Sequence, residues 1–197
     1  MSAVARQAWL VSLLTLWPVA AWAHVQAGET EGLWSGLWHP VSGLDHVLAM
    51  IAVGLWGAQL GAPALWMLPV TFPMAMAFGG MLGLMGIGFP GVEVGIALSA
   101  IVLGVLVLRE SRPPLWVAAV VVGFFAIFHG HAHGTELPEG QSGLLYSLGF
   151  VVATGSLHGV GIAIGVLHRW SAGRMLLRGA GAVVALAGMA FLWRAVL

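Results

Sequence analysis

The sequence predicts an all-α membrane protein, a polytopic bundle of about six transmembrane helices that follow a cleaved signal peptide. Hydrophobic residues make up 60% of the chain and charged residues only 7%, whereas about a quarter of the residues in a soluble domain are charged. The apolar residues also gather in runs close to the roughly 20 residues that a membrane-spanning helix needs. Composition and run length therefore indicate the same fold class.

The first segment resembles a secretory signal. An apolar stretch ends in Ala21-Trp22-Ala23, which fits the small-x-small rule for signal cleavage. We expect residues 1–23 to be removed, leaving residues 24–197 as a single membrane domain. The alternative is an uncleaved first transmembrane helix, but Trp17-Pro18 interrupts a run that is already short for this role. Cleavage would make His24 the new N-terminus, where its amine and imidazole form a possible chelate.

Six apolar segments follow the signal, and each is a candidate membrane-spanning helix. They cover residues 40–60, 64–86, 92–108, 115–128, 143–167 and 175–196. The fourth segment is short unless it continues into the histidine-rich stretch that follows it. Small-residue pairs four positions apart predict close contact between helix backbones. They are Gly79 and Gly83, Gly155 and Gly159, and Gly161 and Gly165.

The positive charges predict the orientation of the bundle. If the mature N-terminus is periplasmic, five of the arginines fall on the cytoplasmic side: Arg109, Arg112, Arg169, Arg174 and Arg178. This arrangement follows the positive-inside rule. The sequence thus predicts a multi-pass membrane protein, with lipid as its surroundings. It places both histidine-rich segments on the outer, periplasmic side, where we expect them to meet in one outward-facing pathway.

Composition also excludes several functions. The chain has no Lys and a net charge of zero, so it lacks the basic surface of a nucleic-acid binder. It has no Cys, which excludes thiolate metal sites and leaves imidazole and carboxylate as the main candidate ligands. No phosphate-binding G-x-x-x-x-G-K-[ST] loop occurs. We expect no resident cofactor.

The most unusual segment carries three histidines and a carboxylate within nine residues. It reads Phe128-His129-Gly130-His131-Ala132-His133-Gly134-Thr135-Glu136. In a helix, His129, His133 and Glu136 would share one face; in an extended chain, the three histidines would line one side instead. Either conformation gathers imidazoles, and the segment therefore predicts a site for a divalent cation.

A second cluster opens the first apolar segment. It reads His39-Pro40-Val41-Ser42-Gly43-Leu44-Asp45-His46. We expect a helix that begins at Pro40, because proline is favoured in the first helical turn, with His39 at its outer end. His39 and His46 would then lie about 10 Å apart along the axis and would not share one ion directly. Asp45 is costly in an apolar run and is expected to face the site or to orient an imidazole.

Two further residues are candidates of lower rank. His158 falls well inside the fifth apolar segment, where an ionisable side chain is generally functional. Glu93 begins the third segment, where it is either a site carboxylate or a helix-start charge.

At these residues the chain resembles a known family. The segments His39-Pro-x-x-Gly-x-Asp45-His46, Phe-His129-Gly-x-Ala-His133-Gly-x-Glu136 and Gly155-x-x-His158 are similar to the hallmark segments of the HupE/UreJ family. The resemblance covers the whole mature chain. It implies a small inner-membrane nickel, sometimes cobalt, permease associated with hydrogenase or urease maturation and its maturation proteins. It also implies translocation roles for the matching histidines and acids, whereas His131 occupies a variable position of the motif.

The predicted function is therefore a non-enzymatic permease for a divalent transition metal, most consistent with Ni²⁺ or Co²⁺. The predicted metal-contacting residues are His39, Asp45, His46, His129, His131, His133, Glu136 and His158. One alternative is an intramembrane zinc hydrolase, with Ser42 or Ser156 near the metal. Another is a copper(I) carrier that uses a methionine stripe on the second segment, formed by Met74, Met81 and Met85.

Overall fold

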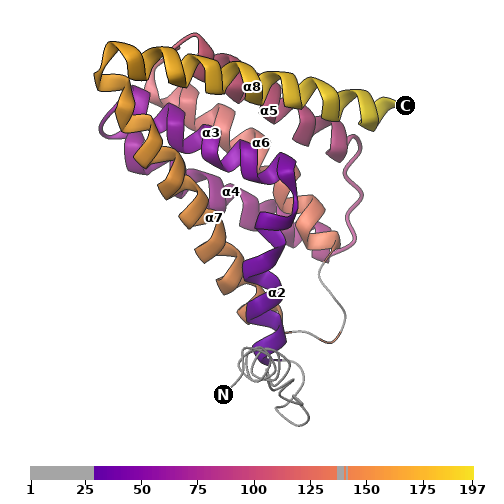
Figure 1. The fold of residues 1–197 in the computed structure, drawn as a ribbon. Helices are drawn as coiled ribbons and strands as arrows, with labels where there is room; N and C mark the ends of the chain where they lie inside the picture. The colour runs from indigo at the N-terminus through magenta and orange to yellow at the C-terminus, as the bar shows by residue number, and fades with distance from the viewer. Residues whose placement is uncertain (1–28, 137–139, 141) are drawn as a thin grey trace, which may run out of the picture.

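The structure, a computed structural model, describes residues 29–136, 140 and 142–197, and this part of the chain is folded into helices without any strand (Figure 1). The predicted signal peptide and His24 lie outside the described residues. The helices are α2 (Glu29–Ser42), α3 (Leu44–Leu60), α4 (Ala64–Leu84), α5 (Val92–Leu108), α6 (Leu115–Thr135), α7 (Gly143–Gly165), the short 3₁₀ helix η1 (Val166–Arg169) and α8 (Ser171–Val196).

Each predicted apolar segment corresponds to a helix, and the boundaries differ most at the first and fourth segments. The predicted third segment coincides with α5, and the fourth continues through the histidines as α6. The first segment begins differently from the prediction, because α2 precedes α3 and contains Pro40. The all-α fold class is confirmed.

The number of membrane crossings is less regular than the six segments predicted. Among the described residues, α4, α6, α7 with η1, and α8 are long and apolar enough to cross a membrane. The α2–α3 pair passes the same test only as one broken span, bent by 80°. α5 has 17 residues, or about 25 Å of helix against a hydrocarbon core of about 30 Å. A multi-pass protein results, although the count of six is not confirmed.

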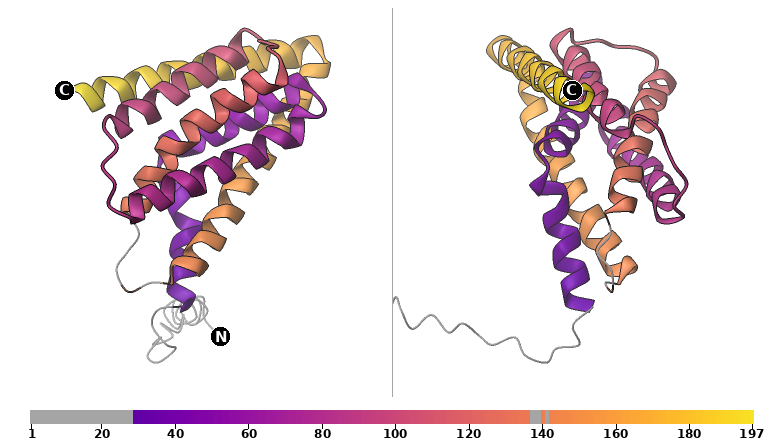
Figure 2. Two further views of the ribbon diagram at one scale, coloured as in Figure 1. Left: turned by 180° about the vertical axis from the view of Figure 1, so that it is seen from behind. Right: turned by 90° about the vertical axis from the view of Figure 1, so that its right-hand side faces the viewer.

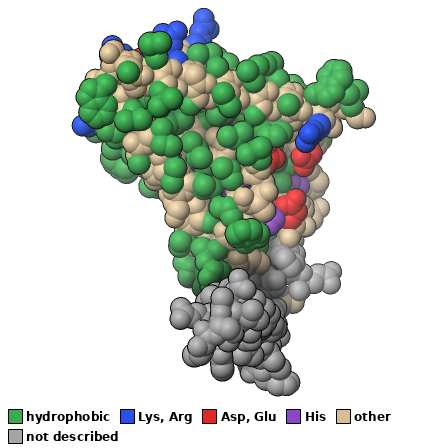
Figure 3. All heavy atoms as spheres, viewed as in Figure 1, with side chains coloured by type: hydrophobic (Ala, Val, Ile, Leu, Met, Phe, Trp, Pro, Cys, Tyr) green, Lys and Arg blue, Asp and Glu red, His purple; other side chains and the backbone are tan. Residues whose placement is uncertain are grey.

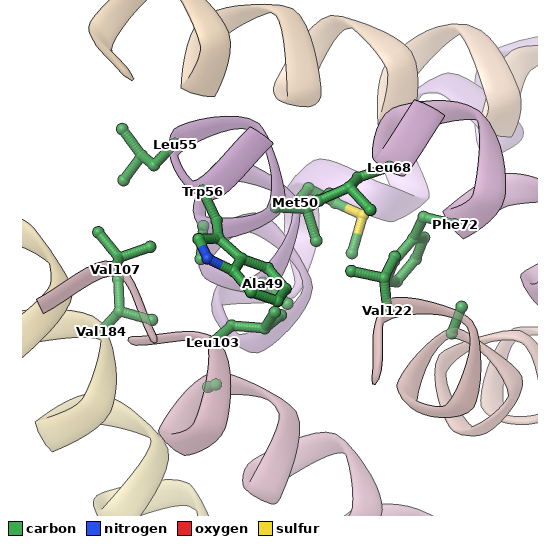
Figure 4. Close-up of a cluster of buried hydrophobic side chains, with 14 of the residues drawn as sticks. Ala49, Met50, Leu55, Trp56, Leu68, Phe72, Leu103, Val107, Val122 and Val184 are labelled. Carbon is green, nitrogen blue, oxygen red and sulfur yellow. The ribbon is translucent and has the colours of Figure 1, made fainter. Parts of the chain in front are cut away.

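Four close helix–helix contacts organise the bundle. α4 lies along α6, α5 lies along α8, and α7 packs against both α2 and α3 (Figure 2). α3 is central, since it also contacts α4, α5 and α8. Its fully buried Trp56 lies over Leu103 of α5, and Phe72 of α4 lies beside Val122 of α6 (Figure 4). Trp56 also donates a hydrogen bond to the Ser111 carbonyl at 2.9 Å.

Glycine allows α4 and α6 to touch backbone to backbone. A Cβ atom at Gly130 of α6 would overlap the Met76 carbonyl, and one at Gly134 would overlap the Gly80 carbonyl. From the other side, Gly79 and Gly83 of α4 leave no room beside the carbonyls of α6. The glycines between the histidines therefore hold the last turns of α6 against α4.

The glycine pairs on α7 differ from one another. Gly161 packs on the Ile51 carbonyl and Gly165 on Ala58, both in α3, as close-packing pairs do. Gly155 and Gly159 have open space where a Cβ atom would lie. The prediction of tight packing is therefore confirmed for the first pair and wrong for the second.

Charged side chains divide between the two ends of the bundle. The turns that connect α5 to α6 and α7 to α8 lie at one end, and the C-terminal ends of α4 and α6 lie at the other (Figure 1). Figure 3 shows most of the arginines at the first end and a group of acidic side chains and histidines on the flank nearer the second. This separation agrees with the charge pattern from which the topology was predicted.

Candidate metal centre

The helical conformation is interrupted at Gly43, and this interruption positions the first histidine cluster. α2 ends at Ser42 and α3 begins at Leu44, with an 80° bend between the two helices. The predicted continuous helix from Pro40 is therefore wrong, because Pro40 lies inside α2 and His39 is in its last turn. A Cβ atom at Gly43 would lie 2.9 Å from Oδ1 of Asp45, so the Asp45 side chain would have to shift if another residue stood at the bend.

The second histidine cluster is helical. α6 runs to Thr135, so His129 and His133 lie one turn apart and face the bundle, and Glu136 follows directly. The helical alternative is thereby confirmed, and the extended one is wrong. Since α6 is held against α4 by its glycines, the direction of these histidines is fixed by backbone packing.

Three imidazoles from the two clusters meet inside the bundle. His46, His129 and His133 each offer a ring nitrogen, and these nitrogens all lie within 4.8 Å of one another. We call this group the inner triad. His46 is 2% exposed and His129 is 1% exposed. The predicted convergence of the two clusters is confirmed, since His133 Nε2 lies 3.2 Å from His46 Nδ1.

A second group lies nearer the surface and shares one member with the first. His39, His133 and Glu136 offer ligand atoms within the same 4.8 Å limit, and we call them the outer triad. His39 Nε2 lies 3.0 Å from Glu136 Oε2 and 2.7 Å from His133 Nδ1. The hydrogen bond with His133, together with the charges of both imidazoles, lowers the pKa of the Glu136 carboxyl despite its partial burial. The carboxylate is therefore available to a cation at neutral pH.

His133 connects the two triads through its two ring nitrogens. Nδ1 faces His39 and Glu136, and Nε2 faces His46. Two nitrogens bound to one tetrahedral metal at about 2.0–2.1 Å are roughly 3.3 Å apart. The 3.2 Å separation of His133 and His46 matches that spacing, whereas the 2.7 Å separation of His39 and His133 is that of a hydrogen bond.

Buried hydroxyl groups orient the inner imidazoles. Ser99 donates its proton to the Ile96 carbonyl at 2.6 Å and lies 2.9 Å from His129 Nε2. Because that proton is already used, Ser99 accepts from Nε2–H, which leaves Nδ1 of His129 as the unprotonated atom. Thr154 lies 3.5 Å from His46 Nε2 on the other side. Such partners hold metal-binding imidazoles in one tautomer and orientation.

An acidic cavity of about 390 Å³ surrounds the triads. Besides the histidines and Glu136, it is lined by Asp45, Glu93 and Ser42, and none of the arginines in the described part of the chain lines it. α2 and α6 both end here, so their negative dipole ends face the cavity. Asp45 and Glu93 lie in the first turns of α3 and α5, where a carboxylate offsets the positive helix end. The cavity is thus arranged to attract a cation.

The sequence was compared with protein families and with individual known proteins, and both comparisons give a match. The protein-family model described as HupE / UreJ protein matches residues 12–191 of this chain. The chain is also 49% identical over 175 residues to Protein HupE of Rhizobium leguminosarum bv. viciae, an alignment that covers 89% of this chain and 91% of that protein.

The chain belongs to the HupE/UreJ family. It is thus a multi-pass membrane protein of the hydrogenase and urease accessory class of metal transporters. No solved structure matches the chain significantly.

The HupE/UreJ motif residues do not all reach the triads. Asp45 lines the cavity, but its carboxylate accepts a hydrogen bond from the backbone N–H of His46 at 2.8 Å. His131 points elsewhere: its Nε2 lies 2.8 Å from the Ile87 carbonyl, and its ring lies against Phe89. The structure therefore does not support the prediction of His131 as a metal-contacting residue. His158 is buried below the triads and belongs to neither.

Aromatic and hydroxyl neighbours of the triads were missed in the sequence. Phe150 lies 4.6 Å from His133 between ring centroids, and Phe72 lies 5.6 Å from His129. Ser99 and Thr154 provide the hydroxyl groups described above. Single Ser, Thr and Phe residues are common in the apolar helices of membrane proteins. No sequence pattern therefore distinguished Phe72, Ser99, Phe150 and Thr154 from the other residues of their helices.

Proposed function

We propose that this HupE/UreJ protein is an inner-membrane permease that captures Ni²⁺, or Co²⁺, at the outer triad and passes it to the inner triad. The single observation that supports this best is the shared His133, whose two nitrogens face the two triads. An ion held by exchangeable imidazoles is released more easily than one in a closed cage, as transport requires. The ion is cargo, not a cofactor.

The proposed orientation follows from charge. The histidine cavity opens at the end of the bundle away from most arginines, so we place it on the periplasmic side, with the mature N-terminus. Residues 1–23 are proposed to be the cleaved signal. Capture then occurs on the periplasmic side of the inner membrane, and delivery to hydrogenase or urease maturation proteins follows on the cytoplasmic side.

The alternatives have less support in the geometry. The methionines proposed for a copper(I) carrier, Met74 and Met81 on α4 and Met85 directly after it, are all exposed, and none lines the histidine cavity. For a zinc hydrolase, Ser42 lines the cavity, but its hydroxyl donates to the His39 carbonyl at 2.7 Å. Ser156 is exposed on α7, donates to the Val152 carbonyl and does not line the cavity. Imidazole and carboxylate suit Ni²⁺, Co²⁺ and Zn²⁺ alike, so the choice among these ions needs measurement.

Transport by purified protein in vesicles tests the proposal. A chelating dye inside the vesicles reports Ni²⁺ entry, and Co²⁺, Zn²⁺ and Cu⁺ are added as competitors. We expect Ni²⁺ flux that Co²⁺ reduces more strongly than Cu⁺ does. His46→Ala and His129→Ala should each remove the flux without loss of inserted protein, because each removes an inner-triad ligand.

His168→Ala is the matched control, since this imidazole contacts only the Gly165 carbonyl at the other end of α7. It should transport like the wild type. Unchanged flux in both inner-triad variants would refute the site, and flux of Cu⁺ alone would refute the choice of metal. Hydrolysis of a peptide or ester by the zinc-loaded protein would favour the enzyme instead.

A further inference from the structure

His158 is a buried imidazole that the triads do not use. It is 1% exposed, and neither Nδ1 nor Nε2 has a hydrogen-bond partner among the described residues. Buried polar atoms in folded proteins are nearly always paired, and each unpaired one destabilises the folded state. If His158 served packing alone, an apolar residue of similar size could take its place without loss of stability. Its two free nitrogens therefore point to a ligand.

The position of His158 continues a row of contacts along α7. Phe150, Thr154 and His158 are spaced four residues apart, so they share one face at steps of about 6 Å. Phe150 contacts His133, and Thr154 contacts His46. His158 is the next residue on this face, one turn farther from the cavity mouth than the inner triad.

One aromatic ring contacts both His158 and the inner triad. The ring centroid of Phe72 lies 5.6 Å from that of His129 and 5.6 Å from that of His158. Phe72 is fully buried, and Met50 of α3 points toward it (Figure 4). His158 is therefore connected to the inner triad through contact with a single phenyl ring.

The backbone at His158 is held firmly. A Cβ atom at Gly54 of α3 would overlap the His158 carbonyl, and Gly161, one turn on, packs against Ile51. α3 and α7 therefore touch at this level, and the depth of His158 relative to His46 is set by that contact. The backbone that carries the His158 imidazole is therefore held at a fixed depth, beside the Phe72 ring.

We propose that His158 is an inner transit ligand, which receives the divalent cation from the inner triad when the Phe72 ring turns aside. This rests on the proposed transport function. A single imidazole at this point binds the ion weakly, so the ion moves on toward the cytoplasmic end instead of being retained. His158 is then needed for translocation and not for capture.

Replacement of His158 by leucine tests this proposal, because leucine fills a similar volume and removes no hydrogen bond. We expect His158→Leu protein to be as heat-stable as the wild type and to bind Ni²⁺ with unchanged affinity at equilibrium, measured by calorimetry in detergent. Its Ni²⁺ flux into vesicles should fall at least tenfold. His158→Cys, which offers a sulfur ligand at the same place, should recover part of the flux.

The outcomes separate this inference from the proposed function. Wild-type flux in His158→Leu vesicles would overturn the transit role while leaving the triads intact as the capture site. Loss of heat stability in His158→Leu, with no recovery by His158→Cys, would show a structural role and overturn it as well. Absence of Ni²⁺ binding and flux in the wild type would instead refute the transport function itself. His168→Leu serves as the control for removing a histidine outside the path.

Discussion

The two triads share His133 but differ in their access to water. In the outer triad, the side chains of His39 and Glu136 are 26% and 54% exposed. In the inner triad, His46 and His129 are almost completely buried and are oriented by hydroxyl groups. The outer group is therefore suited to exchange with hydrated ions, and the inner group is suited to select an ion that has lost its water.

This difference assigns separate tasks to neighbouring ligands. Rigid, dry ligands favour one coordination geometry, whereas exposed ligands on a helix end and a connecting segment adapt to many. We therefore expect changes in the inner triad to alter metal preference and flux together, and changes in the outer triad to alter mainly the rate of capture. The following variants test this comparison, beginning with the largest expected effect.

Replacing His133 should have the largest effect, because it belongs to both triads. We expect His133→Ala to reduce Ni²⁺ uptake by cells to background, with normal amounts of protein in the membrane. His39→Ala, which leaves the inner triad complete, should retain measurable uptake. Equal uptake by the two variants would contradict the shared role of His133.

Gly130 tests whether helix packing positions the inner triad. Gly130→Ala forces a Cβ atom onto the Met76 carbonyl, and such overpacking generally costs about 1–3 kcal/mol or more. We expect a lower melting temperature in detergent and weaker Ni²⁺ binding. Gly155→Ala, where the added Cβ atom meets open space, should do neither. Equal melting temperatures for both variants would argue against the tight α4–α6 contact.

Ser99 tests the orientation of His129. Ser99→Ala removes the hydroxyl that accepts from Nε2, and loss of such a partner usually weakens metal binding by about 10–100-fold. We expect a loss in this range for Ni²⁺, measured by calorimetry. The control is Ser156→Ala, whose hydroxyl is exposed and bonds only the Val152 carbonyl. An unchanged affinity in Ser99→Ala would show that the hydroxyl does not orient the ligand.

Replacing Glu136 should have the smallest effect on uptake. The same variant also shows which groups account for the pH dependence of uptake. Its pKa is lowered below the ordinary 4.5, mainly by its hydrogen bond with His133. The carboxylate therefore stays ionised as the pH falls, and its contribution is lost only below that lowered pKa. Between about pH 7.5 and 5.5, loss of capture must come from protonation of imidazoles, whose ordinary pKa is about 6.5.

We expect initial wild-type uptake at limiting Ni²⁺ to fall across this pH range. Glu136→Gln should reduce uptake by about twofold to fivefold, the size of an exposed charge interaction. Its midpoint should also move to lower pH, because the carboxylate no longer favours the protonated imidazoles. A flat wild-type profile, or a midpoint that moves to higher pH, would contradict capture by the outer histidines.

The sequence predicted the fold class and the meeting of the histidine clusters, since both follow from hydropathy and helical periodicity. It did not predict the bend at Gly43, because Pro40 is compatible with either the start or the end of a helix. His131 was wrongly grouped with its neighbours, because the choice between a helix and an extended chain decides which way it faces. The dual contact of His133 depends on how α2, α3 and α6 pack, which no local pattern encodes.

The cavity around the triads has an electrical consequence. On the proposed periplasmic side, it brings the outer aqueous phase to the outer triad, so most of the transmembrane voltage falls across the closed part beyond the two triads. In the proposed orientation, binding at the outer triad is then nearly independent of voltage. A divalent ion that crosses the closed part gains up to about 4.6 kcal/mol per 100 mV, inside negative. The membrane potential alone would therefore draw the ion past His158 and make its return slow.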